Sequence, residues 1–133
     1  MRKTNYSYET TKFKIELADA GYILVTFNEQ ITVTVDDVKS VSERIKWLTN
    51  GSPHCLLVDI SNNPIFSENV QAYAASLDNY KEKYAEAVVV SSSWQARAAN
   101  FYGKYLRKFH YVQRFFYSRE KAISWLSKQK PEN

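Results

Sequence analysis

Apolar and polar residues alternate near the start of the chain. The apolar residues of 13–17 (FKIEL) occupy every second position, and Lys14 and Glu16 lie between them. This alternation is typical of a half-buried β-strand. Residues 18–21 (ADAG) predict a turn and residues 22–27 (YILVTF) a second strand, so the two strands are expected to pair as an antiparallel hairpin.

A helix is predicted after the hairpin. Residues 31–35 (ITVTV) are either a short third strand or the lead into this helix. Thr34 can cap a helix of about 14 residues, and Asp36 and Asp37 suit its positive amino end. The pair at 50–51 (NG) ends it. An apolar stripe along one side predicts its buried face: Val38, Val41, Ile45 and Leu48.

The second half of the chain alternates between strands and helices. Residues 55–60 (CLLVDI) are almost uniformly apolar, as in a central strand that is covered on both faces. Strands joined through helices run parallel, so we predict a mixed α/β sheet with a parallel core, an N-terminal antiparallel hairpin and about four helices. The remaining elements are, in order, a helix capped by Ser67, a strand at 87–91, a helix at 92–109, a strand at 112–117 and a helix capped by Ser118.

Length and composition favour one globular domain. The 133 residues are 44% apolar and 24% charged, which predicts a single domain over 1–133 with its core at about 12–128 and frayed termini. No apolar stretch is long enough for a transmembrane helix, and no signal peptide is recognised at the N-terminus. The single cysteine, Cys55, is compatible with a reducing compartment. These features predict a cytoplasmic location.

The order of elements resembles a known family of domains. Two segments carry the resemblance: LLVDIS (56–61) at the end of the central strand, and FFYSREKAISWL (115–126) near the carboxyl terminus. Together they resemble the STAS domains, the anti-sigma-factor antagonist fold, and most of all their uncharacterised SpoIIAA-like bacterial relatives. The resemblance implies a SpoIIAA-like fold and a non-enzymatic regulatory or binding module that mediates protein–protein interaction.

The same resemblance focuses attention on the residues after the central strand. In antagonist-type STAS domains a phosphorylated serine opens the helix that follows this strand. Here Glu68 or Asn69 occupies that position, Ser67 comes just before it, and no glycine follows. Ser67 is therefore either part of a switch or a helix cap, and the cap is the plainer interpretation.

We take Asp59, Ser61, Ser67 and Glu68 as a candidate strand-end loop site. The carboxyl ends of parallel strands are where α/β proteins often place functional groups. Asp59 is expected either to bind a ligand or to cap a neighbouring helix, with the cap favoured. Ser61 is expected to be a turn residue that hydrogen-bonds the local backbone.

Catalytic and metal-binding patterns are sparse. Only His54 and His110 could act as bases at neutral pH, and Cys55 next to His54 is expected to be a buried apolar residue. None of the recognised Cys/His ligand spacings and no phosphate-binding glycine motif occurs. The sequence predicts no metal, no cofactor and no enzymatic activity.

Charge is distributed unevenly along the chain. Residues 16–43 hold six acids against one lysine, whereas residues 91–121 hold seven basic residues against one acid. On the predicted helix at 92–109, Arg97, Lys104 and Lys108 fall within about 40° of one line. They form either a basic docking surface for an acidic partner or anionic lipid, or an ordinary solvated face.

The sequence therefore favours binding over catalysis. An unknown protein partner is the first choice, and a homodimer stays open. A carrier of a small apolar or lipid-like ligand is one alternative, because the aromatic content permits a pocket. An enzyme with an unrecognised site at the strand ends is the other. Nucleic acid is an unlikely partner because the net charge is only +4 and no nucleic-acid-binding motif occurs.

Overall fold

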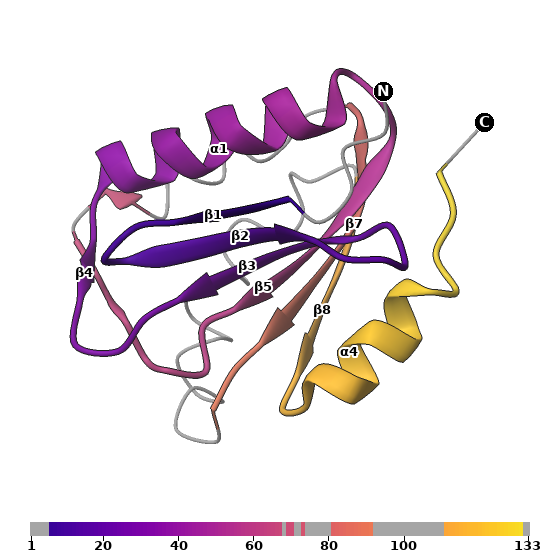
Figure 1. The fold of residues 1–133 in the computed structure, drawn as a ribbon. Coiled ribbons are helices and arrows are strands. Elements are labelled where there is room, and N and C mark those ends of the chain that lie inside the picture. Colours follow the sequence, from indigo (N-terminus) through magenta and orange to yellow (C-terminus); the bar gives the residue numbers. More distant parts are fainter. Residues whose placement is uncertain (1–5, 68, 71–72, 74–80, 92–110, 132–133) are drawn as a thin grey trace.

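The computed structural model describes residues 6–67, 69–70, 73, 81–91 and 111–131 (Figure 1). Within these residues a six-stranded sheet has the order β1-β2-β3-β5-β7-β8. The first three strands are antiparallel, and β3, β5, β7 and β8 run parallel to one another. The strands are β1 (Ser7–Glu9), β2 (Phe13–Leu17), β3 (Ile23–Phe27), β5 (His54–Asp59), β7 (Lys83–Val89) and β8 (Val112–Phe116).

The N-terminal hairpin forms as predicted. Strands β2 and β3 pair in register with Phe13 opposite Phe27. The turn between them closes with a 2.9 Å hydrogen bond from the Gly21 N–H to the Ala18 carbonyl. Gly21 has φ +96°, a left-handed conformation that favours glycine. The structure adds β1, which pairs with the outer side of β2 and extends the hairpin to a three-stranded antiparallel unit.

Residues 31–35 are both a short strand and the lead into a helix. Strand β4 (Thr32–Val33) pairs in parallel with β6 (Ile65–Phe66) in a separate two-stranded sheet. Helix α1 (Val35–Thr49) begins directly afterwards with Thr34 as its N-cap, in a reciprocal capping box with Asp37. Asn50 ends α1 in a left-handed conformation with φ 47°. The predicted cap and stop of this helix are confirmed.

The central position of β5 is also confirmed. Leu56 belongs to the apolar cluster on one face of the sheet and Leu57 to the cluster on the other. Strand β7 begins at Lys83, earlier than the predicted residue 87. The reason is that Lys83 and Glu86 are buried inside this strand as an ion pair, so its first half does not read as an apolar run.

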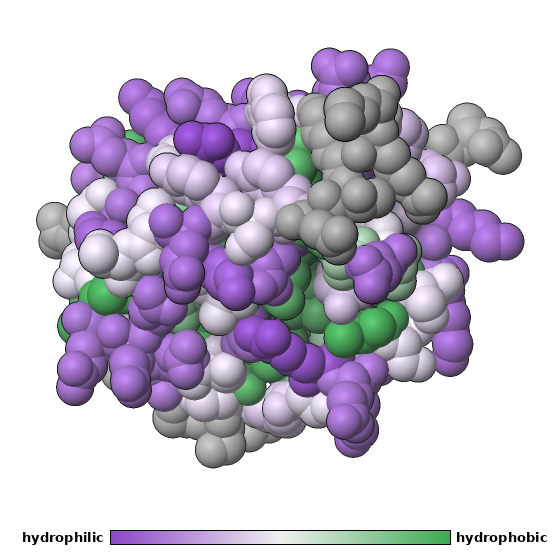
Figure 2. Space-filling model, in the orientation of Figure 1, coloured by the Kyte–Doolittle hydropathy of each residue, from purple (hydrophilic) through white to green (hydrophobic). Residues whose placement is uncertain are grey.

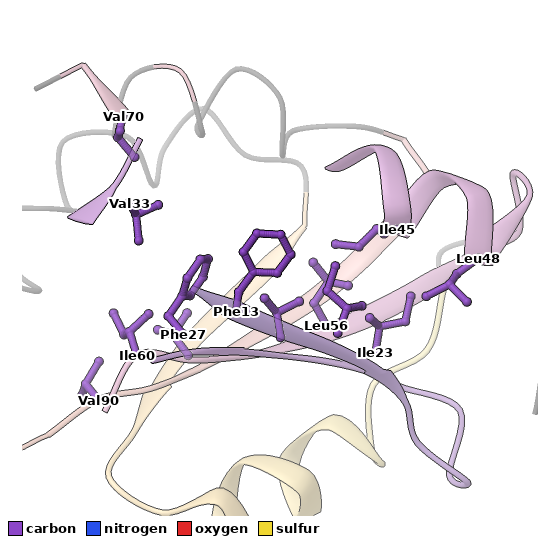
Figure 3. Packing of buried hydrophobic residues seen from close by; sticks show 13 residues of the cluster. Phe13, Ile23, Phe27, Val33, Ile45, Leu48, Leu56, Ile60, Val70 and Val90 are labelled. Carbon is purple, nitrogen blue, oxygen red and sulfur yellow. The ribbon is translucent and has the colours of Figure 1, made fainter. Parts of the chain in front are cut away.

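Among the described residues, one helix lies on each face of the sheet. Figure 3 shows Ile45 and Leu48 of α1 directed at sheet residues that include Ile23 and Leu56. Helix α4 (Arg119–Leu126) is capped by Ser118 as predicted and lies on the opposite face. The smaller cluster under α4 consists of Leu24, Cys55, Leu57, Ala85, Ala87, Val89, Ala122 and Leu126.

Two helices, α1 and α4, are described in full, against about four predicted. The predicted second helix is represented by Val70 and Tyr73, which are helical. Its other residues after Val70, and the predicted helix at 92–109, lie outside the described residues. Among the helices that the structure describes, none combines the length and apolar character needed to cross a membrane.

Candidate functional site

The Asp59 carboxylate organises the carboxyl end of β5. Asp59 is only 4% exposed to solvent. Oδ1 accepts hydrogen bonds from the Ser61 N–H at 2.9 Å and from the Ser61 hydroxyl at 2.6 Å. Ser61 is thus a local turn residue, as predicted, although it bonds a carboxylate instead of the backbone.

The other Asp59 oxygen binds the first residue of α4. Arg119 Nε donates to Asp59 Oδ2 at 2.5 Å, and Arg119 Nη2 donates to Thr26 Oγ1 at 3.1 Å. Thr26 is the register partner of Asp59 on β3, so one guanidinium spans two neighbouring strands. Among the described residues, Asp59 accepts no bond from a helical backbone N–H. The expected helix cap is thus not formed among the described residues, where an ion pair to the first residue of α4 occupies the carboxylate.

The segment that follows is held in place along its whole length. We call residues 60–67 the strand-end loop. Its hydrogen bonds reach β7, Ser91 just beyond β7, the end of β3 and the segment around β4. They are Ile60 N–H to the Val89 carbonyl (2.9 Å), Asn62 Nδ2 to the Phe27 carbonyl (3.0 Å), Ser91 Oγ to Asn63 Oδ1 (2.8 Å), Ile65 N–H to the Ile31 carbonyl (2.9 Å) and Ser67 N–H to the Val33 carbonyl (3.0 Å).

The strand-end loop keeps its backbone fixed while it exposes selected side chains. Asn62 and Asn63 are exposed, and Ile65 is 64% exposed. Pro64 is buried, and Phe66 packs edge-on against Phe27 with ring centroids 6.4 Å apart. The loop thus presents one aliphatic side chain and two amide groups on a rigid support. None of its side chains is charged.

The structure gives Ser67 a backbone role. Its N–H continues the pairing with β4, and its carbonyl accepts a 3.3 Å hydrogen bond from the Val70 N–H. Asn69 has a left-handed φ of 70°, and the described helical residues begin at Val70. No hydrogen bond joins the Ser67 hydroxyl to another described residue, so the predicted side-chain cap is not formed there. Glu68 lies outside the described residues.

The predicted basic docking surface also lies outside the described residues. Arg97, Lys104 and Lys108 all belong to the segment 92–110. Their proposed alignment on one helix face stays a prediction. The structure therefore brings together Asp59 and Ser61, and it adds Thr26 and Arg119. The backbone of Ser67 pairs elsewhere, with Val33 of β4. Sequence reasoning missed Thr26 and Arg119, although Arg119 directly after a helix cap was visible in the sequence.

A second polar cluster lies near the opposite end of the parallel strands. The Lys83 side chain is fully buried and its Nζ lies 3.1 Å from Glu86 Oε1. Gln113 Nε2 donates to Glu86 Oε2 at 2.5 Å, and Lys83 Nζ lies 3.8 Å from the centre of the Tyr111 ring. The ammonium and the carboxylate are thus both satisfied inside the protein, as buried charges must be.

His54 and Cys55 are both buried at the amino end of β5. Burial lowers the pKa of His54, and the Lys83 ammonium adds to the decrease, against the effect of a 2.8 Å hydrogen bond from Nδ1 to the Ser52 carbonyl. Cys55 is 6% exposed, which confirms the expected buried position, and burial raises the pKa of its thiol. In the part of the chain that the structure describes, no three His, Cys, Asp or Glu residues are placed to hold a metal ion.

The comparisons with known proteins agree with the fold. An uncharacterised protein of the DUF3478 family from Shewanella loihica, with a SpoIIAA-like fold, superposes with a TM-score of 0.62 at 20% identity, over 93% of this chain and 98% of that one. The predicted SpoIIAA-like α/β fold is thereby confirmed. No curated protein matches. Residues 15–130 match the family described as a domain of unknown function, DUF7793, and the chain belongs to that family.

Proposed function

We propose that this protein is a non-enzymatic regulatory or binding module that docks a protein partner on the strand-end loop. The observation that carries the proposal is the exposure of Ile65 on a backbone held by hydrogen bonds at both ends. A preformed loop loses little conformational freedom when it binds, so more of the contact energy appears as affinity. An aliphatic anchor flanked by amides suits a protein surface.

The rest of the visible surface is compatible with a local docking site. On the face shown in Figure 2, hydrophilic residues predominate around a smaller hydrophobic area near the middle of the view. In this proposal a short segment of the partner contacts the loop, within the reducing cytoplasm that the single cysteine favours.

The arrangement of polar groups supports binding over catalysis. Asp59 and Ser61 satisfy each other, and Arg119 occupies the remaining carboxylate oxygen. His54 is the first residue of β5 and Asp59 the last, which separates them by about 16 Å at the usual rise of a strand. The candidate base and the strand-end polar groups thus do not converge on one substrate.

A photo-crosslinking experiment tests the proposed docking site. A photoreactive residue at Asn62 is compared with one at Ser124, an exposed position on α4, in lysate of the host organism. We expect a discrete adduct from Asn62 and none from Ser124. Ile65→Ser should reduce the Asn62 adduct at least about tenfold, since one buried aliphatic anchor contributes about 1.5–3 kcal/mol.

Val112→Ser is the matched control, because Val112 is an exposed aliphatic residue, 54% accessible, on β8. It should leave the adduct unchanged. The adduct should also resist added salt, since the loop carries no charge, whereas docking on Arg97, Lys104 and Lys108 would weaken in salt. Adducts of equal yield at both positions, or an adduct indifferent to Ile65→Ser, would refute docking on this loop.

A further inference from the structure

The two side chains of the Asp59–Arg119 ion pair differ strongly in their exposure to solvent. The Asp59 side chain is 6% exposed, whereas the Arg119 side chain is 45% exposed. Both carboxylate oxygens are occupied, one by Ser61 and one by Arg119. The negative charge is therefore enclosed, and the positive charge faces the solvent at the carboxyl edge of the sheet.

The guanidinium retains unused hydrogen-bond donors. An arginine side chain carries five N–H groups. Arg119 uses one on Asp59 and one on Thr26, and five minus two leaves three without a partner among the described residues. Because the two contacts fix the plane of the guanidinium, the remaining N–H groups are held in a set direction, and paired guanidinium N–H groups match the geometry of carboxylate and phosphate oxygens.

The position of Arg119 on α4 gives a second reason to expect an anion. Arg119 is the first residue of the helix, directly after the Ser118 cap. A cation at this end opposes the helix dipole, which favours negative charge at an amino terminus. Arg119 is thus poorly placed to stabilise α4 by itself, whereas a bound oxyanion would be attracted by both the guanidinium and the helix end.

We propose that Arg119 binds one oxyanion group, a carboxylate or a phosphate, at the carboxyl edge of β3 and β5. Asp59 and Thr26 act as positioning residues that orient the guanidinium. The site is modest, because acidic groups lie nearby: Glu120 follows Arg119 in the chain, and Glu16 pairs at 2.7 Å with Lys14, the register neighbour of Thr26. A single arginine among balanced charges predicts weak, millimolar binding of a free ion.

The test is a titration of the purified protein that requires no partner. Amide and arginine Nε resonances are followed by nuclear magnetic resonance while inorganic phosphate replaces chloride at constant ionic strength. We expect saturable shifts at Thr26, Arg119 and Glu120. Arg119→Gln should abolish saturation, and Arg114→Gln should not, since Arg114 is an exposed arginine on β8 with the same charge.

Arg119→Lys is the control for folding, because the lysine keeps a cation beside Asp59. It lacks the planar guanidinium that would bind the oxyanion. This variant should fold and bind phosphate at least about fivefold more weakly. Further arms with acetate and with O-phosphoserine distinguish a carboxylate from a phosphate ligand. Shifts that do not saturate with any of the three anions, or that persist in Arg119→Gln, would overturn the site. Because no partner is present, this result is independent of the crosslinking result at Asn62.

Discussion

Two ion pairs near opposite ends of the parallel strands differ in what they leave open to solvent. The side chains of Lys83 and Glu86 are 0% and 6% exposed, and the ammonium also faces the Tyr111 ring. The Arg119–Asp59 pair buries its acid to a similar degree but exposes nearly half of its base. The first pair encloses both of its charges within the fold, whereas the second leaves its positive charge open to solvent.

The difference separates structural from functional charge. A buried pair contributes little net stability over an apolar replacement, yet removal of one partner is costly. A half-exposed arginine is weakly stabilising and remains able to bind another group. We therefore expect the amino-end pair to control stability and the carboxyl-end pair to control recognition.

Removal of Lys83 should produce the largest effect. Lys83→Ala leaves the Glu86 carboxylate buried without its cation, and the free energy of unfolding should fall by about 3–5 kcal/mol. The double variant Lys83→Met with Glu86→Gln removes both charges and keeps an acceptor for Gln113. It should regain most of that loss in urea unfolding. If the double variant is as unstable as Lys83→Ala, the charges themselves do not explain the penalty.

Removal of Arg119 should cost less. Arg119→Gln leaves one oxygen of Asp59 without its charged donor, while Ser61 still satisfies the other. We expect a loss of about 1–3 kcal/mol in the free energy of unfolding. Chemical denaturation of Arg119→Gln beside Lys83→Ala measures the contrast directly. Equal losses at the two sites would mean that solvent exposure of the base makes no difference to these pairs.

His54 should make stability depend on pH at the amino end. The pKa of His54 lies below the ordinary 6.5 in the folded protein. As the pH falls below 6.5, His54 is therefore protonated in the unfolded chain before it is protonated in the folded protein. The stabilising contribution is present above pH 6.5 and is lost as the pH falls, by up to about 1.4 kcal/mol per pH unit.

Melts of the wild type and His54→Gln between about pH 8 and 5.5 check this expectation, since His is the side chain whose ordinary pKa lies in that range. The wild type should lose more stability on acidification than the variant. Parallel pH profiles would show that the buried imidazole is not the titrating group.

Ser67→Ala should produce the smallest effect. The Ser67 backbone makes the contacts of this residue, and its hydroxyl bonds no other described residue. We expect a change within about 0.5 kcal/mol, as at an ordinary surface position. Thr34→Ala is the positive control, because Thr34 forms a complete capping box and its loss should cost about 0.5–2 kcal/mol. A comparable loss from both variants would restore the capping role of Ser67.

Local sequence patterns were sufficient for much of the fold. Alternation predicted β2, and the apolar segment after a turn predicted β3. Cap residues predicted α1 and α4, and an almost unbroken apolar run identified β5 as central. These signals are local because each depends only on the residues of one element. Strand β1 escaped detection because it has only three residues, of which two are exposed. The β4–β6 pair escaped because each strand has two residues.

The candidate site was less predictable than the fold. The position of Asp59 at a strand end followed from the apolar run before it. Its partner Arg119 lies 60 positions further along the chain, and no local period connects the two. The start of β7 was hidden for a related reason, since a buried Lys83 and Glu86 resemble solvent-exposed residues until their pairing in space is known.

The sheet order also carries a consequence for the way the chain folds. The neighbours β1, β2 and β3 are consecutive in sequence and need only short turns to meet. Strands β5, β7 and β8 pair only after long connections close, which costs chain entropy before any pairing is gained. The antiparallel half of the sheet is also synthesised before the strands of the parallel half. It therefore provides an early template on whose β3 edge the parallel strands are added in the order in which they are synthesised.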